Sequence, residues 1–191
     1  TNSKSIKKIR FVDIRSNQLV RRVDENDGIP NIRKLKEMKL NKYDAVIVSD
    51  YDKGFLTKQQ MNYIASNSKL SFLQTSKVLE KWCENFNYIK INNYEFQNTS
   101  QFTPKKYLEQ LNLIITKGER GAVFKNKNFE IKKPVTVRSL AGAGDTFLAG
   151  LVSSYVQNNT IEKSIKFAQN QSKKAVSELG ISVVGDKKNN K

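Results

Sequence analysis

A run of small residues followed by one carboxylate is the part of the chain best suited to chemistry. The run is Ala141-Gly142-Ala143-Gly144-Asp145-Thr146, and the apolar residues that follow it recur at helical spacing. We therefore expect Asp145 in the first turn of a helix. Glycines just before that turn leave backbone N–H groups accessible, and these groups together with the helix dipole favour a bound anion.

A phosphoryl group is such an anion, and Asp145 would then lie beside the reacting atoms. A carboxylate in this position could accept the proton of an attacking hydroxyl, as a general base does in phosphoryl transfer. The structural alternative is an acidic residue that only stabilises the first turn of its helix. The pattern Gly-x-Gly-Asp before a helix fits both interpretations.

Further polar segments follow apolar strands, and each has a structural alternative. Asn92 and Glu95 could form a capping box at the start of a helix. Residues 117–121 could be a charged hairpin turn between two strands. Asp50 and Asp52 beside Lys53 could be a solvated charge cluster at a strand end, although strand ends of this kind bind ligands in open α/β sheets.

Taken in order, these motifs resemble those of the PfkB, or ribokinase-like, carbohydrate kinases over nearly the whole chain. The glycine turn looks like the family's C-terminal signature. Residues 92–95 are similar to its Asn-x-x-Glu motif, and residues 116–121 to its Thr-x-Gly-x-x-Gly segment. Residues 10–24 and 48–54 resemble the lid and the Ser-Asp-Tyr-x-Lys-Gly segment of the family's heptose 7-phosphate kinases.

The resemblance implies an ATP-dependent sugar kinase with a role for each motif. Asp145 would be the catalytic base, and Gly142, Ala143 and Gly144 would form the anion hole for the transferred phosphoryl group. The substrate would be a sugar phosphate, heptose 7-phosphate, which is phosphorylated at its anomeric hydroxyl.

The same resemblance implies the binding residues and the cofactors, ATP and Mg²⁺. The nucleotide-binding residues would be Asn92, Glu95, Thr116, Gly118, Gly121 and Asn170. Asn92 and Glu95 would also act on Mg²⁺ indirectly, by ordering the phosphates. The substrate-binding residues would be Asn17, Asp50 and Lys53.

Alternating strand and helix patterns predict an α/β fold with a largely parallel sheet. The resemblance implies a ribokinase-like form of it, with helices flanking the sheet and a small β lid. We expect a kinase domain over residues 1–185, with its lid hairpin at 8–24, and a disordered tail at 186–191. The expected helices include 57–67, 77–85 and 160–179. The expected strands include 45–49, 70–74, 88–91 and 113–116.

Departures from the family pattern bear on activity. The chain begins at the lid, so we expect an N-terminally truncated fold without the family's first strands and Gly-Gly sugar segment, and with an open sheet edge. Ser139 and Gln74 stand where the family or its heptose branch has aspartate, and Ala141 where it has threonine or serine. We expect weaker polar support for the glycine turn. These departures keep open a non-catalytic relative that binds nucleotide or a partner protein.

Composition bounds the class of protein. A chain of 191 residues suits one domain. A mean hydropathy of −0.60 without a long apolar run argues against a membrane span. Histidine is absent, which excludes a histidine triad and histidine-ligated metals. The single cysteine, Cys83, fits a reducing compartment, so a cytoplasmic location is expected.

The net charge of +16 raises the question of nucleic-acid binding. The basic clusters have no aromatic platform between them, so we prefer a general compositional bias and keep a nucleic-acid-binding protein as a weaker alternative. The expected partners are a sugar phosphate and ATP, with neither nucleic acid nor membrane. The protein partners considered are a second copy, bound through the lid, and a complementing N-terminal half.

Overall fold

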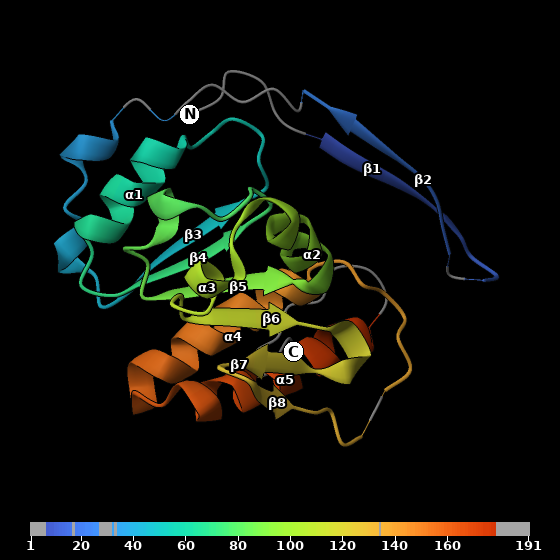
Figure 1. Cartoon of the computed structure of the whole chain (residues 1–191). Helices are drawn as coiled ribbons and strands as arrows, with labels where there is room; N and C mark the ends of the chain where they lie inside the picture. The colour runs from blue at the N-terminus through green and yellow to red at the C-terminus, as the bar shows by residue number, and fades with distance from the viewer. Residues whose placement is uncertain (1–6, 17, 27–31, 33, 134, 179–191) are drawn as a thin grey trace, which may run out of the picture. The chain divides into compact units, whose positions relative to one another are not determined.

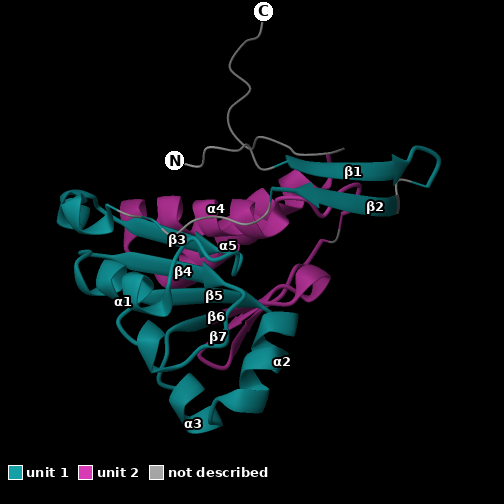
Figure 2. Ribbon diagram, turned by 90° about the horizontal axis from the view of Figure 1, so that it is seen from above, with its two compact units in different colours: residues 1–113 teal, residues 114–191 magenta. Residues whose placement is uncertain are grey.

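The computed structural model describes residues 7–16, 18–26, 32, 34–133 and 135–178 (Figure 1). The chain divides into two compact units, residues 1–113 and 114–191 (Figure 2). Asn17 and the predicted tail at 186–191 lie outside the described residues. None of the helices in the described part is both long and apolar enough to cross a membrane.

The predicted lid hairpin is confirmed. Strands β1 (Lys7–Asp13) and β2 (Gln18–Glu25) pair antiparallel, with an irregularity in register between Phe11 and Val12. At the turn, the Asp13 carboxylate accepts hydrogen bonds from the Ser16 hydroxyl and backbone N–H, which hold the pKa of Asp13 below its usual value. Several apolar side chains of the hairpin are exposed, with Ile14 at 91% and Val20 at 71%.

The predicted parallel strands of the first unit are also confirmed. Strands β3 (Val46–Asp50), β4 (Ser71–Thr75) and β5 (Tyr88–Asn92) pair in parallel in that order. Every residue of β4 is buried, as expected for a strand between two others with both faces covered. All three strands end at the same edge, where their polar residues gather.

Helices of the first unit begin where side chains can cap them. Helix α1 (Lys58–Ser66), expected over residues 57–67, begins at a capping box between Thr57 and Gln60. Helix α2 (Asn93–Phe102) follows β5 directly. Pro104 is the residue just before the short α3 (Lys105–Leu108). The short 3₁₀ helices η1 (Leu35–Glu37) and η2 (Leu40–Lys42) precede β3.

The helix expected over residues 77–85 is wrong, because the segment forms only the 3₁₀ turn η3 (Lys81–Cys83). Side chains of α2 and the residue after it occupy the backbone that a helix would use. The Leu79 N–H donates to Thr99 Oγ1 at 3.3 Å, and the Leu79 carbonyl accepts from Thr103 Oγ1 at 2.6 Å. Since these partners lie 20 and 24 residues away, tertiary contacts decide the local structure.

The second unit joins antiparallel strands to two helices. Strands β6 (Leu113–Thr116), β7 (Ala122–Phe124) and β8 (Lys127–Phe129) pair antiparallel, and η4 (Gly118–Arg120) lies between the first two. Helices α4 (Ala143–Asn158) and α5 (Ile161–Val176) follow. They approach closely at Gly150, where an added Cβ would lie 3.3 Å from the Ala168 Cα.

Candidate active site

The glycine turn and its carboxylate lie at the start of α4, as predicted. Gly142 precedes the helix with φ of 78°, a left-handed conformation that glycine adopts without strain. An added Cβ there would meet no atom within 4 Å, so the space around the turn is open. Asp145 is exposed in the first helical turn, and residues 142–144 are half-buried.

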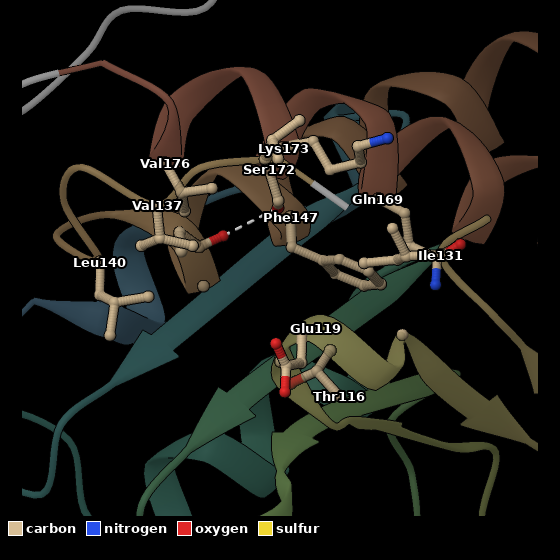
Figure 3. A pocket seen from close by; sticks show the side chains of 15 residues that line it. Thr116, Glu119, Ile131, Val137, Leu140, Phe147, Gln169, Ser172, Lys173 and Val176 are labelled. Atoms are coloured by element: carbon tan, nitrogen blue, oxygen red, sulfur yellow. Dashed lines mark hydrogen bonds between the residues drawn. The ribbon is translucent and has the colours of Figure 1, made fainter. Parts of the chain in front are cut away.

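Hydrogen bonds from neighbouring segments hold this turn in place. The Ser139 hydroxyl accepts from the Ala141 N–H at 3.2 Å, so serine retains part of the polar support that we expected to be weaker. Ser172 of α5 donates to the Ala143 carbonyl at 3.0 Å (dashed line in Figure 3). The Arg138 N–H donates to the Val176 carbonyl at 2.8 Å, which satisfies one of the free carbonyls at the end of α5.

A cavity of about 190 Å³ borders this turn within the second unit (Figure 3). Ala143 and Gly144 contribute to its wall from the start of α4. Four residues of the predicted nucleotide segment also line it, namely Thr116, Gly118, Glu119 and Gly121. The remaining wall is mainly apolar, formed by Ile131, Val135, Val137, Leu140, Phe147 and Val176. The structure therefore brings the glycine turn and the Thr-x-Gly-x-x-Gly segment together around one largely apolar cavity.

The segment around this second motif is also the hairpin turn that the alternative predicted. The Lys117 N–H donates to the Gly121 carbonyl at 2.7 Å, which closes the loop between β6 and β7. Gly121 has φ of 88°, and an added Cβ would lie 1.9 Å from the Phe129 carbonyl oxygen. Only glycine fits this position, so the segment both turns the chain and forms a wall of the cavity.

Asn170 of α5, expected to contact the nucleotide, is exposed and is not among the residues that line the cavity. The lining residues of this helix are Gln169, Ser172, Lys173 and Val176. These positions are three, four and seven residues apart, which is one face of an α-helix. Gln169 is seven residues before Val176 and so lies on the same helical face. This spacing could have identified Gln169 as a lining residue, which the sequence analysis did not do.

Asn92 and Glu95 form a complete capping box at the start of α2. The Glu95 N–H donates to Asn92 Oδ1 at 2.8 Å, and the Asn92 N–H donates to Glu95 Oε2 at 2.7 Å. Ser76 donates to the other Glu95 carboxylate oxygen at 3.2 Å. The capping box that the structural alternative predicted is thus confirmed. Both carboxylate oxygens of Glu95 accept hydrogen bonds from the protein.

This geometry is compatible with the indirect role toward Mg²⁺ that the sequence suggested. In the described part of the chain, no group of three or more acidic, histidine or cysteine residues could hold a metal ion. Mg²⁺ usually keeps several waters and binds through substrate phosphates and one or two carboxylates. The single carboxylate of Glu95 fits such water-mediated contact, and the apolar cavity of the second unit suits a flat nucleotide base.

Asp50 belongs to a buried ion pair, so the solvated-cluster alternative is wrong for this residue. Its Oδ2 accepts from Thr75 Oγ1 and from Lys77 Nζ, both at 2.9 Å, and its side chain is 3% exposed. Lys77 also contacts the exposed Asp52 at 2.6 Å. Burial alone would lower the pKa of Lys77, but hydrogen bonds to Asp52 and Asp50 outweigh it and raise the pKa. Lys53 is exposed.

Two lysines, the half-buried Lys77 and the buried Lys90, were not anticipated as site residues. Lys77 neutralises Asp50, as described above. Lys90 of β5 is 4% exposed and donates to Gln74 Oε1 at 2.7 Å. Gln74, the residue that stands in place of an aspartate, therefore accepts a hydrogen bond from a buried ammonium group. A lysine inside an otherwise apolar strand is the signal that could have pointed to this pair.

Residues 15–186 match the sequence family described as pfkB family carbohydrate kinase, so the chain belongs to this family. The bifunctional protein HldE of a Nitratiruptor species is 30% identical over 87% of this chain and 40% of its own length. A nucleoside kinase of Methanocaldococcus jannaschii is 34% identical over 47% of this chain and 32% of its own length. The chain thus spans less than half the length of these relatives.

Solved structures show the same fold. The M. jannaschii nucleoside kinase structure has a TM-score of 0.67 at 22% identity, covering 93% of this chain and 63% of that one. Ribokinase of Thermotoga maritima has a TM-score of 0.70 at 18% identity, covering 93% and 65%. The fold is therefore ribokinase-like, with parallel and antiparallel strands, flanking helices and a small antiparallel lid sheet.

Proposed function

We propose that this chain forms the nucleotide-binding and catalytic part of an ATP-dependent carbohydrate kinase with Asp145 as general base. The observation that carries the proposal is the exposed Asp145 at a helix start whose glycine turn borders the cavity. Family membership supports the same reaction class. ATP, when bound, supplies the phosphoryl group, and Mg²⁺ offsets the phosphate charge.

Each part of the proposed site would have its own role in binding or in phosphoryl transfer. The apolar cavity would hold the base, and the N–H groups of Gly142, Ala143 and Gly144 would stabilise charge that develops on the phosphoryl group. The Ala143 N–H donates to the Leu140 carbonyl at 3.3 Å in the structure and would exchange that partner for the phosphoryl group. Asp145 would accept the proton of the attacking hydroxyl. Asn92 and Glu95, in the first unit, would keep the phosphate-ordering role that the family resemblance implies.

Heptose 7-phosphate is the substrate that we propose, phosphorylated at its anomeric hydroxyl. The support is the resemblance of residues 10–24 and 48–54 to heptose 7-phosphate kinases. Asn17, Asp50 and Lys53 are the proposed sugar contacts. The net charge of +16 would also favour encounter with an anionic substrate.

Phosphorylation of a nucleoside is a second candidate, because a nucleoside kinase is 34% identical over 97 residues of this chain. Nucleosides are uncharged, whereas heptose 7-phosphate carries a phosphate. The two candidates therefore differ in whether the phosphate group of the substrate is needed for turnover.

The test is ADP release by the product of the complete reading frame that encodes residues 1–191. Heptose 7-phosphate, its dephosphorylated form and a set of nucleosides are offered in turn with Mg-ATP. Turnover only with heptose 7-phosphate is the expected result. Turnover with nucleosides would select the second candidate, and ATP binding without turnover on any acceptor would mean a non-catalytic relative.

A further inference from the structure

We propose that Ser76 is a positioning residue that holds the carboxylate of Glu95 in the orientation needed for Mg-ATP. This inference rests on the proposed function, because it takes Glu95 as the residue that acts on Mg²⁺ through water. Ser76 is not among the site residues expected from the sequence.

The carboxylate of Glu95 is held at both of its oxygens. The Asn92 N–H donates to Oε2 at 2.7 Å, which is the contact that a capping box makes. Ser76 Oγ donates to Oε1 at 3.2 Å, a contact that capping does not require. The last torsion of a glutamate side chain is broad, so a carboxylate bound through one oxygen can still turn. The hydrogen bond from Ser76 therefore fixes the plane of the carboxylate.

This arrangement leaves room at Glu95 for further donors. A carboxylate has about four lone-pair sites, and Asn92 and Ser76 each use one, on different oxygens. Glu95 is half-buried, so water can reach it. Mg²⁺ in such sites keeps several of its waters, and these waters are hydrogen-bond donors. The direction in which the carboxylate plane faces thus decides how well Glu95 accepts from them.

Ser76 itself is fixed by the turn that follows β4. Its N–H donates to the Asp50 carbonyl, at the end of β3, at 3.2 Å. The next residue, Lys77, donates through its N–H to Thr75 Oγ1 at 3.1 Å and through Nζ to Asp50 Oδ2 at 2.9 Å. These contacts hold the turn on both sides of Ser76. Its hydroxyl is therefore already in place to orient Glu95.

A role for this hydrogen bond in stability alone would have a different signature. Ser76 is exposed, so water can replace much of what its hydroxyl contributes to the folded state. If Ser76 orients Glu95 toward the metal, its loss should weaken binding only when Mg²⁺ accompanies the nucleotide. Groups that orient a metal-facing residue affect metal binding in this way.

The experiment is calorimetric titration of the product of the complete reading frame with ATP, once with saturating Mg²⁺ and once with EDTA. In Ser76→Ala we expect Mg-ATP to bind about threefold to tenfold more weakly, which is the effect of one hydrogen bond. Binding of metal-free ATP should be unaltered. Ser76→Thr, which keeps a hydroxyl group, should restore the affinity for Mg-ATP.

Ser100→Ala is the matched control. Ser100 is an exposed serine of α2, and its Oγ donates to the Phe96 carbonyl at 2.7 Å. The substitution removes the same atom from the helix that carries Glu95, but from a group that does not contact the carboxylate. It should leave both titrations unaltered. An equal loss in Ser76→Ala and Ser100→Ala would place the effect in the helix as a whole and overturn the proposal.

Glu95→Gln separates this inference from the proposed function. If the protein binds no ATP, or if Glu95→Gln leaves the affinity for Mg-ATP unaltered, the proposed function is wrong in that part and the inference fails with it. If Glu95→Gln weakens Mg-ATP binding and Ser76→Ala does not, the inference alone is wrong. It is also overturned if Ser76→Ala weakens ATP binding equally with Mg²⁺ and with EDTA, or if Ser76→Thr does not restore binding.

Discussion

The carboxyl ends of β3, β4 and β5 and the start of α4 both concentrate polar groups, but they use them differently. In the first unit the polar groups bind one another: Lys77 contacts Asp50, and Glu95 accepts from Asn92 and Ser76. In the second unit α4 begins at Gly142, which has no side chain to cap the helix, and Asp145 is exposed.

The difference indicates what each region contributes. Polar groups that satisfy one another fix the shape of a strand edge, and their loss should be felt mainly as lost stability. A helix start with open space beside its glycine, as at Gly142, is instead suited to a bound anion. Substitutions at the start of α4 should therefore change activity more than stability. Substitutions at the strand edge of the first unit should change stability more than activity.

The largest effect that we expect is on turnover in Asp145→Asn. Removing a general base typically lowers kcat by about a hundredfold to ten-thousandfold. The free energy of unfolding should change by no more than about 1 kcal/mol, the usual value of an acid in a first helical turn. ADP release and urea unfolding measure the two quantities.

Glu162→Gln is the matched control, because Glu162 is the acid in the first turn of α5. It should change stability by a similar amount and leave kcat unaltered. Equal kinetics in the two variants would show that Asp145 only stabilises its helix.

The next largest effect should be the loss of stability in Lys77→Met. The change leaves the carboxylate of Asp50, 3% exposed, without its cation. Breaking such a buried pair costs about 3 kcal/mol or more. Lys58→Met removes a pair with Glu80 in which both side chains are at least 42% exposed, and should cost less than about 1 kcal/mol.

The pH dependence of this loss follows from the pKa of Lys77, which is raised above 10.5. A raised pKa means that the charged lysine stabilises the fold fully below its unfolded pKa, and that this contribution falls as the pH rises through the folded value. The difference between the parent chain and Lys77→Met in urea unfolding should thus be constant at neutral pH and shrink only above 10.5. A difference that shrinks at neutral pH would contradict the assignment.

Asn92→Ala and Thr57→Ala compare the two complete capping boxes, at α2 and α1. Each substitution should lower the free energy of unfolding by about 1 kcal/mol, because each removes the side-chain acceptor for an N–H of the first turn. Only Asn92→Ala should also raise the KM for ATP, if Asn92 helps to order the phosphates. If the two variants change the free energy of unfolding and the KM for ATP in the same way, Asn92 only caps its helix.

Local patterns predicted most of the fold because the signals are local. The Thr57 and Asn92 caps, the apolar runs of β3 to β5 and the glycine turn before α4 each depend on residues within a few positions. The helix prediction for residues 77–85 was wrong because Thr99 and Thr103 hydrogen-bond to the backbone of that segment. The sequence of the segment itself gives no sign of these distant partners.

The candidate site was predicted to the level of segments but not of single side chains. Gln169 and Asn170 are neighbouring amides, and only the rotation of α5 against the cavity separates them. The ion pair between Asp50 and Lys77 joins the ends of two different strands, so its burial depends on the assembled sheet. Such facts come from packing rather than from composition or spacing.

The smallest effect on turnover, and the sharpest test of the open helix start, is expected in Gly142→Ala. Alanine in the left-handed conformation costs about 1 kcal/mol, and the Cβ would meet no protein atom within 4 Å. Asn159→Ala makes a comparable change at the other end of α4, where φ is 56°. Both variants should therefore unfold at similarly reduced urea concentrations. Only at Gly142 does the new methyl group enter the space proposed for the phosphoryl group, so only that variant should lose turnover, by about tenfold or more. Equal turnover in the two variants would mean that the open space beside Gly142 is not where the anion binds.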